Sequence, residues 1–357
     1  MGRTIPMPDA NTSKHGLVQP VVGMKKLMLF FVFTAISASS MFLLLCLDDS
    51  DVLVPTNIEA YAAQPEGSEE SFGILLKALK QEIPYQETPL DLSRKKKDEE
   101  GYQDLLIENR DLIILNYAQA QAPLNELKPL NGFEEIGDTS ISYDSETVNF
   151  RSIRDMLNAV CLYTELSYIE DSSEKSLDDL LQIHSIGAKW LQNTRTLVHC
   201  MIGIVALNQI RDTLSMIAPH LNPDEVQQVL KAYSNAPDFP RAIETALYSE
   251  YCMAAYTLDG ILSEGKAGLS YLLFKRNKTL NIYGTYLEEQ IASSRRQDWK
   301  SMSERSDALE EAFDRFHPTN WGGWTFLAMA VPGMKNVIKK AYEAESKDLE
   351  LIKKLHP

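Results

Sequence analysis

One uncharged apolar run constrains this chain more than any other feature of its sequence. Residues 27–47 read LMLFFVFTAISASSMFLLLCL, about 21 residues without a charged side chain. As an α-helix rising about 1.5 Å per residue, the run can cross a hydrocarbon layer of about 30 Å. A helix also satisfies its own backbone hydrogen bonds, which lipid cannot do. The sequence therefore predicts a transmembrane helix at residues 27–47.

The charges on either side of this run predict its orientation. Four basic residues precede it (Arg3, Lys14, Lys25 and Lys26), and Asp48, Asp49 and Asp51 come directly after it. Positively charged flanks stay in the cytoplasm. We therefore expect a short cytoplasmic tail at residues 1–26 and a C-terminal domain exported to the periplasm or the cell exterior.

Two alternatives to an uncleaved anchor stay open. A cleaved signal peptide has an apolar region of only about 7–15 residues, and the small-x-small triplet Ala60-Tyr61-Ala62 lies well downstream of this longer run. A lipid-modified Cys46 requires a small preceding residue, whereas Leu45 stands there. Met24 also begins an export-signal pattern and is an alternative start to Met1. A small-residue patch at 37–40 could pair two membrane helices, although the sequence does not set the number of copies.

Length and charge constrain the rest of the chain. It has 357 residues in all, and 44% hydrophobic content is ordinary for a packed domain. Residues 48–68 read as an irregular linker and 69–357 as one helical domain, with its core at 149–347. The net charge of −15 argues against a nucleic-acid partner, because phosphates require many Lys and Arg contacts.

Apolar periodicity predicts helices throughout this domain. The expected helices are 69–83, 98–122 ended by Pro123, 149–168, 176–191, 197–214, one that starts at 222–225, 240–261, 277–294, 301–316 and 334–355, the last preceded by a short segment at 325–331. Residues 124–147 read as a loop. The 197–214 segment is apolar nearly all round, which predicts a central, buried helix. Asn222-Pro223-Asp224-Glu225 is a specific helix start, with a cap, a first-turn proline and two acids.

These helices indicate an all-α fold. The helix at 149–168, a tight turn and the helix opened by Ser176 predict an antiparallel hairpin. Hairpins in series are typical of tetratricopeptide-like repeats, but no fixed period is kept. We therefore expect an irregular helical-hairpin array, either a solenoid or an orthogonal bundle, behind one N-terminal transmembrane helix.

Three segments carry a resemblance. RDMLNAVCLYTELSYIEDSSEKSLDDLLQIHSIGAKWL at 154–191, LVHCMIGIVALNQI at 197–210 and NKTLN at 277–281 resemble a group of uncharacterised bacterial exported, membrane-anchored all-helical proteins. The resemblance covers about residues 150–335 and rests on general pattern. It implies an envelope helical protein and carries no known activity or site residues.

No motif in the sequence predicts a cofactor or a metal. Zinc sites need clustered His and Cys, whereas His199-Cys200 stands without a second pair and His184 lies about four helical turns upstream. We expect buried structural histidines and buried thiols at Cys161, Cys200 and Cys252, with one disulfide among them as the alternative. No nucleophile elbow or Walker loop occurs, so no catalytic residue is predicted.

Trp321-Gly322-Gly323-Trp324 is the most unusual string in the chain. Trp321 and Trp324 could form a contact surface for a partner, or they could close one end of the helical bundle.

The predicted function is a single-pass envelope scaffold that binds a protein or peptide through a helical groove. The alternative is an envelope hydrolase whose site assembles from distant residues. A polar pocket with converging histidines and carboxylates would favour the enzyme, and an exposed groove would favour binding.

Overall fold

The computed structural model describes residues 30–40, 68–92, 101–137, 149–172, 176–235, 237–263, 275–313, 320, 324–325, 327 and 334–356. Within these ranges the regular elements are helices, and no strand occurs among them. The predicted all-α class is therefore confirmed.

The helices fall into a first and a second group along the chain. The first group is α3 (Ser68–Leu79), α4 (Pro89–Leu92), α5 (Tyr102–Glu108), α6 (Arg110–Leu127), α7 (Phe150–Ile169) and α8 (Leu177–Gln192). The second is α9 (Leu197–Ile217), α10 (Pro223–Tyr233), α11 (Phe239–Ser263), α12 (Arg276–Arg295), α13 (Trp299–Phe313) and α15 (Met334–Leu355). Two 3-10 turns, η2 (Lys128–Gly132) and η3 (Ala218–His220), extend α6 and α9.

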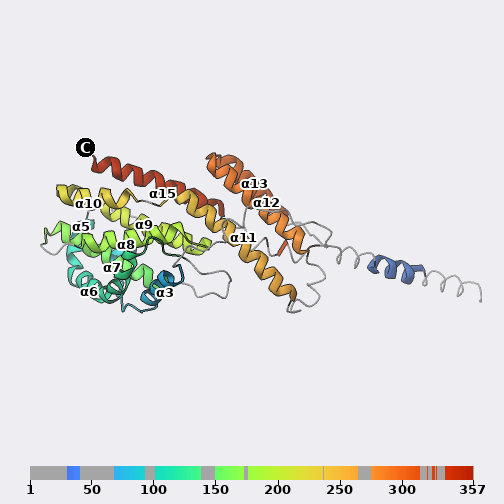
Figure 1. Ribbon diagram of the computed structural model, residues 1–357, viewed down its shortest axis with the longest axis horizontal. Coiled ribbons are helices and arrows are strands. Elements are labelled where there is room, and N and C mark those ends of the chain that lie inside the picture. The colour runs from blue at the N-terminus through green and yellow to red at the C-terminus, as the bar shows by residue number, and fades with distance from the viewer. Residues whose placement is uncertain are drawn as a thin grey trace, which may run out of the picture.

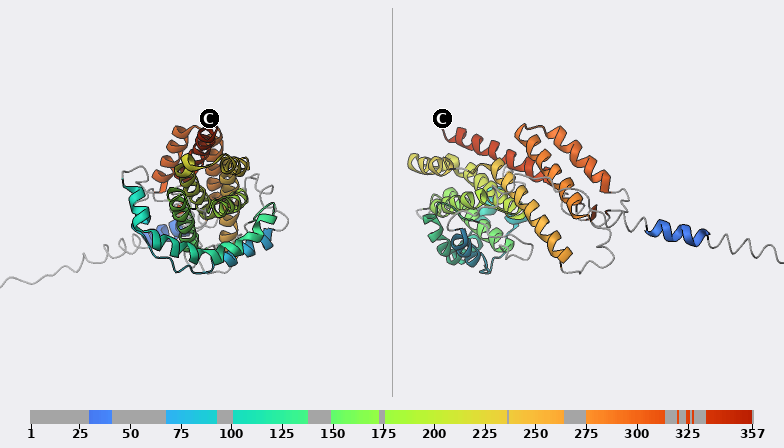
Figure 2. Two further views of the ribbon diagram at one scale, coloured as in Figure 1. Left: turned by 90° about the vertical axis from the view of Figure 1, so that its left-hand side faces the viewer. Right: turned by 45° about the vertical axis from the view of Figure 1, so that its right-hand side comes forward.

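Helix α9 lies at the centre of the molecule. It packs against α7, α8, α11 and α15, while α6 covers α7 and α3 lies on α6. Viewed end-on, α6 lies on one side of the body and α15 on the opposite side (Figure 2). Helices α11, α12 and α13 pack in series and form the end of the molecule away from the C-terminus (Figure 1).

The hydrophobic core runs through nearly the whole domain. Its main part begins at Phe72 in α3 and reaches Leu355 in α15, beyond the predicted limits of 149–347. A smaller cluster centred on Leu106 and Leu166 holds α4 and α5 against α7. The N-terminal helices are therefore part of the packed body.

Side-chain caps begin several helices, including the one that the sequence predicts at Asn222. The Asn149 side chain accepts from the backbone N–H groups of Arg151 and Ser152 at the start of α7. Asn222 and Glu225 form a reciprocal capping box at α10. Asp238 accepts the Arg241 backbone N–H at 3.0 Å near the start of α11.

The sequence predicted a single helix at 98–122. This prediction is wrong in the middle of the range, where the helix is interrupted, and at its end, where the helix continues. The helix is interrupted at Asn109. The side-chain amide of Asn109 donates to the Leu105 carbonyl at 2.8 Å at the end of α5. Helix α6 then continues through Pro123 to Leu127. Leu124 and Leu127 are buried in the main core, and this burial offsets the hydrogen bond that a proline removes. The predicted loop at 124–147 therefore begins with helix and the 3-10 turn η2.

The predicted hairpin of α7 and α8 is a minor contact, because α7 packs more extensively against α6 and α9 than against α8. Ser176 precedes α8 as predicted, but its hydroxyl does not cap the helix. It lies 2.6 Å from the Thr164 hydroxyl, which ties the two helices together. Other helices that follow each other in the chain do pack side by side, namely α6 with α7, α8 with α9, α11 with α12 and α12 with α13.

Helix α13 begins earlier than the predicted 301, because Asp298 accepts the Ser301 backbone N–H at 3.0 Å near its start. On α15, Leu349 is exposed and the neighbouring Asp348 is buried.

The predicted transmembrane run lies mostly outside the described residues. Its described part, 30–40, is helical, with Phe30, Phe33 and Ile36 exposed. Among the described residues, no helix combines the length and the apolar character needed to cross a membrane.

Candidate functional site

The sequence predicted that helix α9 is buried on all sides. In the structure, one face of the helix is exposed. Val198, Met201 and Val205 are 60%, 40% and 53% exposed. These residues stand at positions i, i+3 and i+7, so they form one stripe along the outer face of the helix. A contiguous apolar stripe on the central helix of a bundle is a feature of binding surfaces more than of stable cores.

The inner face of the same helix is tightly packed. A Cβ added at Gly203 would lie 3.0 Å from Leu191 Cδ1 of α8. A Cβ added at Gly187 of α8 would lie 3.3 Å from Leu207 Cδ2 of α9. Gly203 thus permits the close approach of α8, and this contact fixes which face of α9 points outward.

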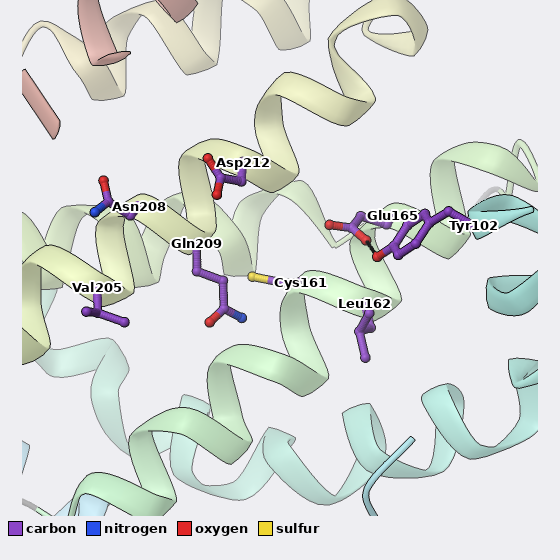
Figure 3. A pocket seen from close by; sticks show the side chains of 8 residues that line it. All are labelled: Tyr102, Cys161, Leu162, Glu165, Val205, Asn208, Gln209 and Asp212. Carbon is purple, nitrogen blue, oxygen red and sulfur yellow. Dashed lines mark hydrogen bonds between the residues drawn. The ribbon is translucent and has the colours of Figure 1, made fainter. Parts of the chain in front are cut away.

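Two cavities meet at the C-terminal end of the exposed stripe, where they share Val205 and Asn208. The α7 cavity, of about 250 Å³, lies between α5, α7 and α9 (Figure 3). Its lining residues are Tyr102, Cys161, Leu162, Glu165, Val205, Asn208, Gln209 and Asp212. The α15 cavity, of about 240 Å³, is lined by Met201, Ile204, Val205, Asn208, Val337, Lys340, Glu343, Ala344 and Lys347. We call the stripe and its two cavities the α9 groove.

The α7 cavity is rich in hydrogen-bond acceptors. Glu165 is fully buried, and its carboxylate accepts from the Tyr102 hydroxyl at 2.5 Å and the Thr213 hydroxyl at 2.7 Å. Figure 3 shows Glu165 and Tyr102 joined at one end of the cavity, with Asp212 on the α9 side. The Asn208 Oδ1 atom is buried and has no hydrogen-bond partner among the described residues. A donor group entering this cavity would find several acceptors.

The α15 cavity has a basic rim. Lys340 and Lys347 are exposed, and neither forms an ion pair within the described part of the chain. Glu343 lies between them in sequence and is 3.9 Å from Lys339. The two sides of the α9 groove therefore differ in charge, with carboxylates toward α7 and lysines toward α15.

A buried ion pair joins α9 to α15 beneath this rim. The Arg211 guanidinium donates to Asp348 Oδ1 and to the Ala344 carbonyl, each at 3.3 Å. Burial raises the pKa of Asp348 to about 6, and the nearby Arg211 opposes this shift without cancelling it. The pair fixes α15 beside α9 and so sets the width of the groove.

The cysteines and histidines expected to be structural lie away from water. Cys161 and Cys200 are buried, Cys252 is half-buried, and all three are thiols. Burial raises the pKa of Cys200 to about 12, which suppresses the reactive thiolate. His184 stacks on Tyr233 with ring centroids 4.4 Å apart, and burial lowers its pKa to about 4. His199 lies on a separate helix against Trp190, with centroids 5.5 Å apart.

Within the described ranges, no group of three or more His, Cys, Asp or Glu side chains could hold a metal ion. The residues that line the α7 cavity include Cys161 and two carboxylates but no histidine or lysine.

Of the two tryptophans singled out in the sequence, Trp324 does not line either cavity of the α9 groove. Trp324 is half-buried and packs against the main core, whereas Trp321 lies outside the described residues. Their role as a contact surface stays a prediction. A different aromatic pair, Trp299 and Tyr342, lines a separate cavity, with ring centroids 5.0 Å apart.

The α9 groove was not predicted from the sequence, although part of its signal is present there. Val198, Met201 and Val205 have the spacing of one helix face, but apolar residues on the other faces of 197–214 hide that stripe. Which face points outward depends on α8 and α15, which come from distant parts of the chain.

No protein-family model matches this chain, and neither a curated protein nor a solved structure is similar to it.

Proposed function

We propose that this protein is a membrane-anchored helical scaffold of the cell envelope that binds a protein or peptide segment in the α9 groove. The observation that carries the proposal is the exposed stripe of Val198, Met201 and Val205, with two cavities that meet at its C-terminal end. Contiguous apolar residues on a protein surface often mark an interaction site.

The shape of the groove favours a helical ligand. The stripe covers two turns, about 10 Å at 1.5 Å per residue. An amphipathic helix lays its apolar face into a groove through residues at the same i, i+3 and i+7 spacing. The cavities on each side would receive the side chains that flank this apolar face.

The alternative of a hydrolase has less support. The residues that line the α7 cavity include no histidine, and the Glu165 carboxylate is already held by two hydroxyls. A nucleophilic thiol at Cys161 would need an adjacent base to activate it. The buried His184 and His199 contact aromatic rings of other helices.

The anchor part of the proposal rests on the uncharged run at 27–47 and its flanking charges. An anchor would hold the groove close to the membrane, where envelope proteins assemble.

The binding part is tested with a fluorescent helical peptide that carries leucines at i, i+3 and i+7 and glutamine elsewhere. The full chain is placed in phospholipid nanodiscs, and binding is followed by fluorescence anisotropy. We expect saturable binding that weakens at least tenfold in Val205→Asp, because a charge would enter the apolar interface. Tyr256→Asp is the matched control, because Tyr256 is 61% exposed on α11. Equal affinity of the two variants would contradict the proposal.

The anchor part is tested by carbonate washing of membranes and by a reporter fused to the C-terminus. We expect the full chain to stay in the membrane pellet and the reporter to be active only outside the cytoplasm. Phe33→Asp together with Ile36→Asp should release the chain, because each charge at mid-membrane costs about 2.5–3.5 kcal/mol. Release of the unaltered chain would contradict the anchor.

A further inference from the structure

The α9 groove has opposite charge on its two sides, and this asymmetry specifies the chemistry of its occupant. We infer that the occupant is an amphipathic helix with acidic side chains on the flank facing α15 and a lysine or arginine on the flank facing α7. This inference rests on the proposed function, because it describes the ligand of the same groove.

The α15 side requires negative charge. Lys340 and Lys347 stand one helical repeat of seven residues apart on α15, so they line the same edge of the groove. Neither has an ion-pair partner in the described part of the protein. Like-charged neighbours on a rim repel an occupant of the same sign and attract one of the opposite sign.

The α7 side requires a cationic donor. Glu165 and Asp212 both line the α7 cavity. Two neutral hydroxyls hold the Glu165 carboxylate, and Asp212 shares Arg211 with Asp348, with an N–O distance of 3.3 Å to Arg211. An ammonium or guanidinium group in this cavity would add a donor to the two carboxylates. The cavity of about 250 Å³ has room for such a head group.

The two flanks together set the direction of the bound helix. With its apolar face on Val198, Met201 and Val205, a helix turned end for end exchanges its left and right flanks. Only one direction places acids beside Lys340 and a base beside Asp212. Charge asymmetry thus selects orientation as well as affinity.

The test uses four fluorescent peptides that share one leucine stripe. One carries glutamine on both flanks, one glutamate on both, one lysine on both, and one glutamate on one flank and lysine on the other. Against the full chain in nanodiscs at low salt, we expect the mixed peptide to bind about three- to tenfold more tightly than the glutamine peptide. This advantage should shrink at high salt because the charges are exposed.

Charge reversal on the protein gives the decisive comparison. In a Lys340→Glu and Lys347→Glu double variant, the lysine peptide should become the tightest ligand and the mixed peptide should lose its advantage. Asp212→Asn should weaken the mixed peptide and leave the glutamine peptide unchanged. Lys353→Glu, at an exposed α15 position outside both cavities, is the control and should preserve the original order.

The possible outcomes separate this inference from the proposed function. Equal binding of all four peptides would overturn the charge assignment and leave the groove intact as a binding site. Failure of all four peptides would overturn the proposed function itself. Concentration-dependent dimerisation that Val205→Asp abolishes would show that a second copy occupies the groove and would also overturn the inference.

Discussion

The two faces of helix α9 belong to the same apolar segment but differ in their packing and exposure. On the inner face, Gly203 and Leu207 make close contacts with Leu191 and Gly187 of α8. On the outer face, Val198 and Val205 have more than half of their surface exposed. Packing explains why the inner residues are apolar, but it does not explain the outer ones. The difference separates residues that hold the fold from residues that we propose contact a ligand.

The largest expected effect is on the inner face. Leu207→Ala should lower the free energy of unfolding by about 2–5 kcal/mol, because it removes a buried side chain and leaves a cavity. Val205→Ala, two residues away, should change it by less than about 0.5 kcal/mol. Equilibrium denaturation by urea measures both values. Similar losses for the two variants would contradict the proposed division between the faces.

The second largest effect concerns the Arg211–Asp348 ion pair, which holds α15 beside the outer face of α9. Because the pKa of Asp348 is raised to about 6 in the folded protein, its protonated form is favoured by folding. Protonation of Asp348 therefore raises the free energy of unfolding as the pH falls from about 7 through 6 toward 4. This gain is lost as the pH rises again. Arg211, Tyr233, Asp212 and Glu345 are the titratable or charged groups that interact with it or with its partner.

Asp348→Asn isolates this contribution. We compare the free energy of unfolding of the native chain with that of this variant. As the pH falls from 7.5 to 4, the value of the native chain should rise by up to about 3 kcal/mol relative to the variant. His184 acts with the opposite sign, since its pKa is lowered to about 4 and its stabilisation is lost as pH falls below 6.5. Taking the difference between the two chains removes that opposing contribution. A pH-independent difference would contradict the raised pKa.

The third effect compares two glycines in helices. Gly73→Ala in α3 should stabilise the protein by about 0.5–1 kcal/mol, because no atom lies within 4 Å of the added Cβ and alanine favours helix. Gly203→Ala gains the same propensity but pushes on Leu191 Cδ1 at 3.0 Å. We expect its unfolding free energy to lie about 1 kcal/mol below that of Gly73→Ala. Thermal denaturation of both variants would resolve the difference, and equal stabilisation would argue against a tight inner face.

The smallest effect on stability should come from the outer face. Val198→Ser should leave the free energy of unfolding within about 0.5 kcal/mol of the native value, because Val198 is already exposed. The same change should weaken binding of the leucine-stripe peptide severalfold. Strong destabilisation without an effect on binding would place Val198 in the fold rather than in the groove.

Local chemistry allowed much of the fold to be predicted. Asn222 followed by Pro223 and Glu225 specifies a helix start without help from the rest of the chain, and α10 begins there. The bounds of α15 also match the predicted 334–355, because its apolar spacing is regular.

The predictions that failed depend on contacts between distant residues. Burial of Leu127 carries α6 past Pro123, and the Thr164 hydroxyl engages Ser176 in place of a cap. The sequence of 197–214 also did not show which face of this helix points outward, because the packing of α8 and α15 determines that face.

Photo-crosslinking from the bound peptide tests most directly whether the α9 groove is the binding site. A diazirine-bearing leucine at the middle of the stripe is activated on the full chain in nanodiscs, and the attached residues are mapped by mass spectrometry. We expect adducts on α9 between 198 and 209 and on α15 between 337 and 347. Adducts concentrated on α12 or α13, or spread evenly over the domain, would contradict binding in the groove.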